Sequence, residues 1–139
     1  SMQAKRICLT AAFDSFYYLP RSTSKENLGN ELLQALRFSW EREGIKFPKE
    51  METIICYDVT FADEKGARAI SSHAGLLFRN QDQYVFIEKL GSSAPYVRFD
   101  FKNKKDLFDW LRAEIEPTMD KGDFLFVSFN DREINQIGR

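Results

Sequence analysis

The stretch Thr53-Ile-Ile-Cys-Tyr-Asp-Val-Thr-Phe61 decides the fold, because from Thr53 onward the sequence takes on the character of β-strands. It is rich in β-branched and aromatic residues, which favour a pleated, partly buried strand. Segments of similar character follow it, with polar turns between them. We expect strands over residues 67–78, 84–90, 96–101 and 123–129. The sequence therefore predicts an antiparallel meander from residue 53 onward.

Helical periodicity precedes this meander and interrupts it once. Between Cys8 and Leu19, apolar residues recur at intervals of three and four, which predicts a helix that Pro20 ends. Further helices are expected over 25–43, where Gly44 supplies the stop, and over 104–115. N-terminal helices packed on an antiparallel, barrel-like sheet give the α+β class. The length of 139 residues fits a single domain over 1–139.

Composition and charge exclude several classes of function. The chain is 43% hydrophobic and 29% charged, which is typical of a globular protein, and its 20 basic and 21 acidic residues leave no cationic excess for nucleic acid. No apolar run reaches the roughly 18 residues that a membrane span needs. Ser1-Met2 resembles the remnant of an expression tag, so an exported or cell-envelope location is expected if a leader originally preceded it.

One histidine, His73, limits where acid–base chemistry can lie. It belongs to Ser71-Ser72-His73-Ala74-Gly75-Leu76-Leu77-Phe78, and the next expected strand contains Glu88. If the hairpin loop covers residues 79–82, His73 lies directly opposite Glu88 and both side chains project from the same face. A slip of one residue would put Glu88 on the other face, so the register decides whether the two side chains meet.

Cys8 is the candidate nucleophile, because it lies at the start of the first expected helix. A free thiol is only a few per cent thiolate at neutral pH, and both a nearby imidazole and a helix amino terminus favour the thiolate. The imidazole needs a third polar group to fix its tautomer and orientation, which is the role expected of Glu88. The backbone N–H of Cys8 would be one donor to the oxyanion.

The block from Ile54 to Glu88, with its His73-Ala74-Gly75 strand and the helix-start Cys8 before it, resembles the core of NlpC-type cysteine peptidases and amidases of the papain-like superfamily. The resemblance implies a papain-like fold with Cys8 as nucleophile, His73 as general base and Glu88 in the third position. It further implies a bacterial source, amide-bond hydrolysis and a cell-wall peptide or related peptide as substrate. No cofactor is expected.

The residues around Cys8 make this an atypical member. The family usually has Asp or Asn before the cysteine and Ser-Gly after it, whereas here Ile7 precedes and Leu9 follows. These flanks motivate an alternative, a catalytically inactive papain-like binding module. Acyl transfer on lipids is disfavoured, because that branch places the histidine before the cysteine and this chain places it after.

Each candidate also has a structural interpretation. Cys8 could be a small buried hydrophobe, His73 a hydrogen-bonded structural histidine and Glu88 a solvated residue at a strand end. Cys56, within an apolar strand, is expected to be buried and structural. Three other residues compete with Glu88 for the third position: Asp58, Asp100 and Asn130. One histidine and two distant cysteines give no zinc pattern, and the acidic turns do not match a calcium loop.

Overall fold

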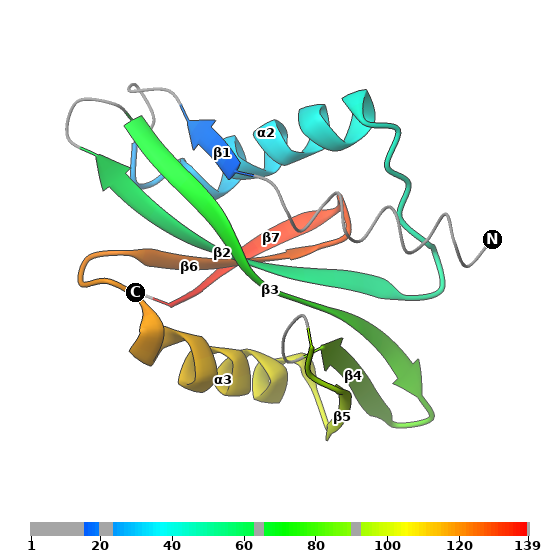
Figure 1. Ribbon diagram of the computed structural model, residues 1–139. Helices are drawn as coiled ribbons and strands as arrows, with labels where there is room; N and C mark the ends of the chain where they lie inside the picture. The colour runs from blue at the N-terminus through cyan, green and yellow to red at the C-terminus, as the bar shows by residue number, and fades with distance from the viewer. Residues whose placement is uncertain (1–15, 20–23, 63–65, 90–92, 139) are drawn as a thin grey trace.

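The computed structural model describes residues 16–19, 24–62, 66–89 and 93–138. Within these residues the chain forms a mostly antiparallel sheet with a helix on each face (Figure 1). The elements follow in the order β1 (Phe16–Leu19), α2 (Leu28–Arg42), β2 (Glu52–Ala62), β3 (Gly66–Asn80), β4 (Gln83–Lys89), β5 (Tyr96–Phe101), α3 (Lys104–Ile115), a short 3-10 turn (Glu116–Thr118), β6 (Phe124–Phe129) and β7 (Glu133–Gly138).

The sheet has the strand order β5-β4-β3-β2-β6-β7, and β1 pairs with β3 outside this path. The 15-residue β3 pairs with β2 along most of its length. Its other edge is shared, since β1 pairs with residues 67–70 and β4 with residues 75–80. On this edge, the part of β3 between residues 70 and 75, which contains His73, therefore lies between the end of β1 and the end of β4.

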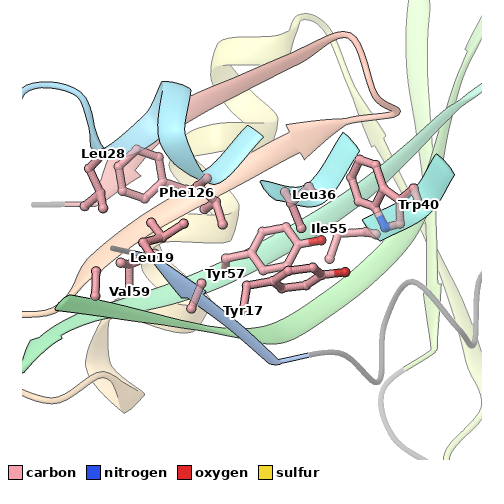
Figure 2. Packing of buried hydrophobic residues seen from close by; sticks show 12 residues of the cluster. Tyr17, Leu19, Leu28, Leu36, Trp40, Ile55, Tyr57, Val59 and Phe126 are labelled. Atoms are coloured by element: carbon pink, nitrogen blue, oxygen red, sulfur yellow. The ribbon is translucent and has the colours of Figure 1, made fainter. Parts of the chain in front are cut away.

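Each face of the sheet has its own hydrophobic core, and β2 contributes to both by simple alternation. Ile55, Tyr57 and Val59 project toward α2, whereas Ile54 and Cys56 project toward α3. Figure 2 shows the α2 side, where Leu36 and Trp40 of the helix pack over Tyr57 of β2 and Tyr17 of β1. The α3 side is built from Leu107 and Leu111 of that helix and the aromatic residues of β4, β5 and β6.

Most of the expected elements are confirmed. The α+β class and the antiparallel pairing are as predicted, α3 and β5 have the expected bounds, and β2 to β4 differ from expectation by a few residues at their ends. The helix expected over 25–43 begins at Leu28, and it ends before Gly44, whose φ of +69° suits glycine at a helix end.

One expectation near the start of the chain was wrong, and one strand near its end was not predicted. The last four residues of the helix expected from Cys8 to Leu19 form strand β1, where Tyr17 and Leu19 are buried and Tyr18 is exposed. All four residues of β1 are aromatic or aliphatic, so a helical stripe and strand alternation both fit them, and pairing with β3 selects the strand. The rest of that expected helix lies outside the described residues. Strand β7 was not predicted, because its exposed edge sequence is mainly polar.

Candidate functional site

The structure brings His73 and Glu88 together on the α3 face of the sheet. The Nδ1 atom of His73 lies 3.1 Å from Oε2 of Glu88, within hydrogen-bond distance. The histidine side chain is 33% exposed, whereas that of the glutamate is 1% exposed. A carboxylate held away from water thus orients an imidazole whose edge is open to solvent.

The contact is diagonal, not directly across the hairpin. The loop is the two-residue Gln81–Asp82 instead of the expected four residues, so Glu88 pairs with Gly75 and the predicted register was wrong by two residues. A slip of two residues leaves every side chain on its original face of the sheet, so His73 and Glu88 still come into contact as expected. Gly75, the direct partner of Glu88, leaves room for the Phe86 ring, with which a Cβ at this position would clash.

An irregularity in β3 sets the face on which His73 lies. Ser71 pairs with Tyr57 and His73 pairs with the adjacent Cys56, so Ser72 is an extra residue in the ladder. Such a bulge reverses the alternation beyond it. It places His73 on the α3 face, although Ala67 and Ala69 earlier in the same strand project toward α2. The sequence contains no clear signal for this bulge.

The carboxylate raises the pKa of His73 above its usual value of 6.5. The hydrogen bond to Glu88 is the largest cause; partial burial opposes it, and the charges of Glu88, Glu114 and Asp58 add to the increase. With Nδ1 committed to the carboxylate, Nε2 is the ring nitrogen available to exchange a proton with another group. The pair therefore has the arrangement of a general base and its orienting acid.

The direct cross-strand partner of His73 is Cys56, a neighbour that sequence reasoning missed. Its thiol is fully buried, and burial, followed by the charges of Glu88 and Asp58, raises the pKa of Cys56 far above the ordinary range. A thiol that stays protonated is a poor nucleophile. The expected buried position of Cys56 is confirmed, and its closeness to His73 follows only from the long-range β2–β3 pairing.

The three competitors of Glu88 have other surroundings. Asp58 acts on His73 only through its charge, and burial is the main cause that raises the pKa of its carboxyl. Asp100 is paired with Arg98 at the exposed edge strand, at 2.9 Å. Asn130 ties the β6–β7 turn to the segment before β2. Among these acidic and amide side chains, only Glu88 forms a hydrogen bond with the imidazole.

Cys8, the candidate nucleophile, lies outside the described residues, so its position relative to His73 is not defined. Within residues 16–19, 24–62, 66–89 and 93–138, no cluster of three or more His, Cys, Asp or Glu side chains is arranged to hold a metal ion. In the same part of the chain, no helix has both the length and the apolar character to cross a membrane.

Comparisons with known proteins place the chain in a family. No curated protein and no solved structure matches it. One family model, described as a domain of unknown function (DUF4300), matches residues 10–132. That match covers most of the 139 residues and includes β1 through the β6–β7 turn. The chain therefore belongs to the DUF4300 family.

Proposed function

We propose that this protein is a cysteine hydrolase that cleaves an amide bond, with Cys8 as nucleophile, His73 as general base and Glu88 as the residue that orients the imidazole. The observation that carries the proposal is the 3.1 Å contact between the partly exposed imidazole and the buried carboxylate. A buried carboxylate bonded to one ring nitrogen leaves the other free to accept a proton, which is what a thiol nucleophile requires.

The raised pKa of His73 supports the same role. A protonated imidazole beside a thiol stabilises the thiolate, and a thiolate–imidazolium pair is the reactive form of papain-like enzymes. The buried carboxylate favours that protonated form, because it supplies the compensating negative charge.

The path of the chain allows Cys8 to reach this site. Strand β1 runs antiparallel to β3, so the chain enters β1 at Phe16, which pairs with Ile70 only three residues before His73. Eight residues lead from Cys8 to Phe16. A segment of that length spans at most about 27 Å when fully extended, so a meeting of sulfur and imidazole is within reach.

In the proposed reaction the Cys8 thiolate attacks the carbonyl carbon of the amide, and the backbone N–H of Cys8 donates to the oxyanion. The imidazolium of His73 then gives its proton to the departing nitrogen, so the C–N bond breaks and a thioester remains. Neutral His73 next accepts a proton from water, whose hydroxyl attacks the thioester. This releases the carboxylic acid and restores the thiolate–imidazolium pair.

The substrate class and the papain-like scaffold rest on the resemblance of the 54–88 block to NlpC-type enzymes. A cell-wall peptide or a related small peptide is the substrate that this resemblance favours. The antiparallel sheet that carries a histidine in one strand and an acid in the next supports the scaffold. Fold alone does not fix function, so the reaction depends on the site and must be tested there.

The test combines alkylation with cleavage. At pH 6 we expect iodoacetamide to label Cys8 at least about tenfold faster in the wild type than in His73→Asn, because an ordinary thiol with a pKa near 8.5 is almost entirely protonated there. Mass spectrometry of peptidoglycan fragments should reveal new amine ends with the wild type and with Cys56→Ala, the matched control, but not with Cys8→Ala.

Two results would contradict the proposal: faster labelling of Cys56 than of Cys8 across neutral pH, or cleavage that persists in Cys8→Ala. Rapid labelling of Cys8 that is identical in wild type and His73→Asn would also overturn the pairing of thiol and imidazole. If Cys8 reacts rapidly but no peptide is cleaved, the binding-module alternative replaces the hydrolase.

A further inference from the structure

A cleft of about 220 Å³ is lined by neither His73 nor Glu88. It lies where the first residue of β2, the end of β3 and the start of β4 meet the first residue of α3 and the β6–β7 turn. Leu77, one of its lining residues, lies four residues beyond His73 in β3, which is about 13 Å along the strand.

The charged lining of the cleft is mainly cationic. Its four basic residues are Lys49, Arg79, Lys104 and Arg132, and its two acidic residues are Glu50 and Glu52. One carboxylate is shared by two of the cations, because Glu52 lies 3.4 Å from Nζ of Lys104 and 3.1 Å from Nη2 of Arg132. Glu133 also lies 3.7 Å from Nζ of Lys104, so the four cations face three carboxylates and keep a net positive charge of one, to which the positive end of α3 adds.

Lys104 is held in place by several contacts at once. Besides Glu52, its ammonium lies 3.7 Å from Glu133 and 4.8 Å from the centre of the Phe129 ring. Its side chain is 34% exposed. Because two carboxylates already share this ammonium, Lys104 adds to the positive charge around the cleft but is not its main donor to an anion.

Arg79 is the cation of the cleft that is most open to a ligand. Its guanidinium lies 5.5 Å from the centre of the Tyr84 ring, a cation–π contact that orients its planar face. Across the part of the chain that the structure describes, no carboxylate forms an ion pair with Arg79. A guanidinium stacked on a ring keeps its edge donors available for two parallel hydrogen bonds to a carboxylate or a phosphate.

From this arrangement we propose that the cleft binds a small organic dianion that carries carboxylate or phosphate groups, recognised by Arg79 and Arg132 with Lys49 and Lys104 around them. The volume holds roughly seven waters, which suits a small metabolite and not a polymer. The partly exposed Met51, Phe78 and Tyr84 also line the cleft and supply apolar surface for the carbon skeleton. This site is independent of Cys8 and His73, and its occupancy does not require the proposed hydrolysis.

The test is a titration of the full chain, followed by ¹⁵N-HSQC NMR, with sodium phosphate in one arm and sodium succinate in the other. Sodium chloride at equal ionic strength is the reference. We expect saturable shifts at the amides that line the cleft, and a dissociation constant about tenfold weaker in Arg79→Gln and in Arg132→Gln, since each removes a charge-assisted hydrogen bond. Arg98→Gln is the matched control, because Arg98 is an exposed arginine on the edge strand β5 outside the cleft.

Saturation with phosphate alone would assign a phosphate-type ligand, and saturation with succinate alone would assign a dicarboxylate. Saturation with both would show a general site for oxyanions. The proposal is overturned if neither anion produces more than the chloride reference. It is equally overturned if Arg98→Gln weakens binding as much as Arg79→Gln, because the anions would then respond only to net charge.

Discussion

At the scale of single residues, the pair of His73 and Glu88 makes the protein's only histidine a direct probe of the site. The hydrogen bond to the carboxylate is the largest cause that raises the pKa of His73, and partial burial acts against it. In Glu88→Gln the charge is lost while the burial remains, so we expect the pKa of His73 to fall below its value in the wild type. The single imidazole Hε1 resonance in an NMR pH titration reports this value without overlap.

Asp58→Asn is the matched control for this titration. Asp58 contributes the smallest of the effects that raise the pKa of His73, so the change should be much smaller than in Glu88→Gln. The sign also fixes the pH dependence of stability. Because the pKa of His73 is higher in the folded state, protonation of this residue stabilises the fold. The stabilisation is complete below the unfolded-state pKa of about 6.5 and is lost as the pH rises through the folded-state pKa. The unfolding free-energy difference between wild type and Glu88→Gln should therefore be larger at pH 5.5 than at pH 9; the opposite order would contradict this account.

The sequence identified the two partners of this contact but not the way they meet. Strand alternation was enough to predict that His73 and Glu88 share a face, and an even slip in register preserves that result. The two-residue turn, the bulge at Ser72 and the nearness of Cys56 depend on pairing between β2 and β3, which joins residues far apart in the chain. The role of Glu88 over Asp58, Asp100 and Asn130 could therefore be argued only from the three-dimensional contact.

At the scale of elements, Asn130 connects the β6–β7 turn to the entry of β2. Its Oδ1 accepts from the backbone N–H of Thr53 at 2.6 Å, and its Nδ2 donates to the carbonyls of Pro48 and Met51, each at 3.2 Å. It also has a φ of +51°, which asparagine adopts more readily than most residues. We expect Asn130→Ala to reduce the free energy of unfolding by about 3 kcal/mol, roughly 1 kcal/mol for each hydrogen bond, as measured by urea denaturation.

A second substitution separates hydrogen bonding from backbone strain at this turn. Asn130→Gly also removes the three side-chain bonds, but glycine tolerates a positive φ, so it should be less destabilising than Asn130→Ala by about 1 kcal/mol. Asn80→Ala, at an exposed position at the end of β3, serves as the control and should stay within about 0.5 kcal/mol of the wild type. Equal losses in all three variants would contradict an anchoring role for Asn130.

Elements with strong internal periodicity were predictable, and short elements at the edges were not. Helix α3 and strand β5 have their expected bounds, because a sustained pattern of apolar residues determines each of them. Strand β1 has four residues, too few to distinguish a helical stripe from strand alternation, and pairing with β3 decides its conformation. Strand β7 pairs with β6 through its backbone while its side chains remain largely polar, so little in its composition indicated a strand.

At the scale of the whole molecule, the order of strands could not be read from the sequence. A simple meander would place each strand beside the next, but β6 lies against β2, so residues 124–129 pair with residues 54–59. This pairing places β2 in the middle of the sheet, where its two faces contribute residues to both cores. The hydrophobic pattern of β2, with apolar residues on both faces, is consistent with a central strand but does not name its neighbours.

Because β2 belongs to both cores, we expect the two layers to unfold as one cooperative unit. The two tryptophans report on them separately: Trp40 of α2 is 2% exposed in one core, and Trp110 of α3 packs against Phe99 with ring centres 4.4 Å apart in the other. In Trp40→Phe and Trp110→Phe, each with a single remaining tryptophan, the urea transition followed by fluorescence should coincide with the transition followed by far-UV circular dichroism. Each variant is compared with its own dichroism curve, so a change in overall stability does not affect the comparison. A fluorescence transition that precedes the dichroism transition in either variant would mean that the helix carrying the remaining tryptophan separates from the sheet first. In that case β2 would not couple the two layers.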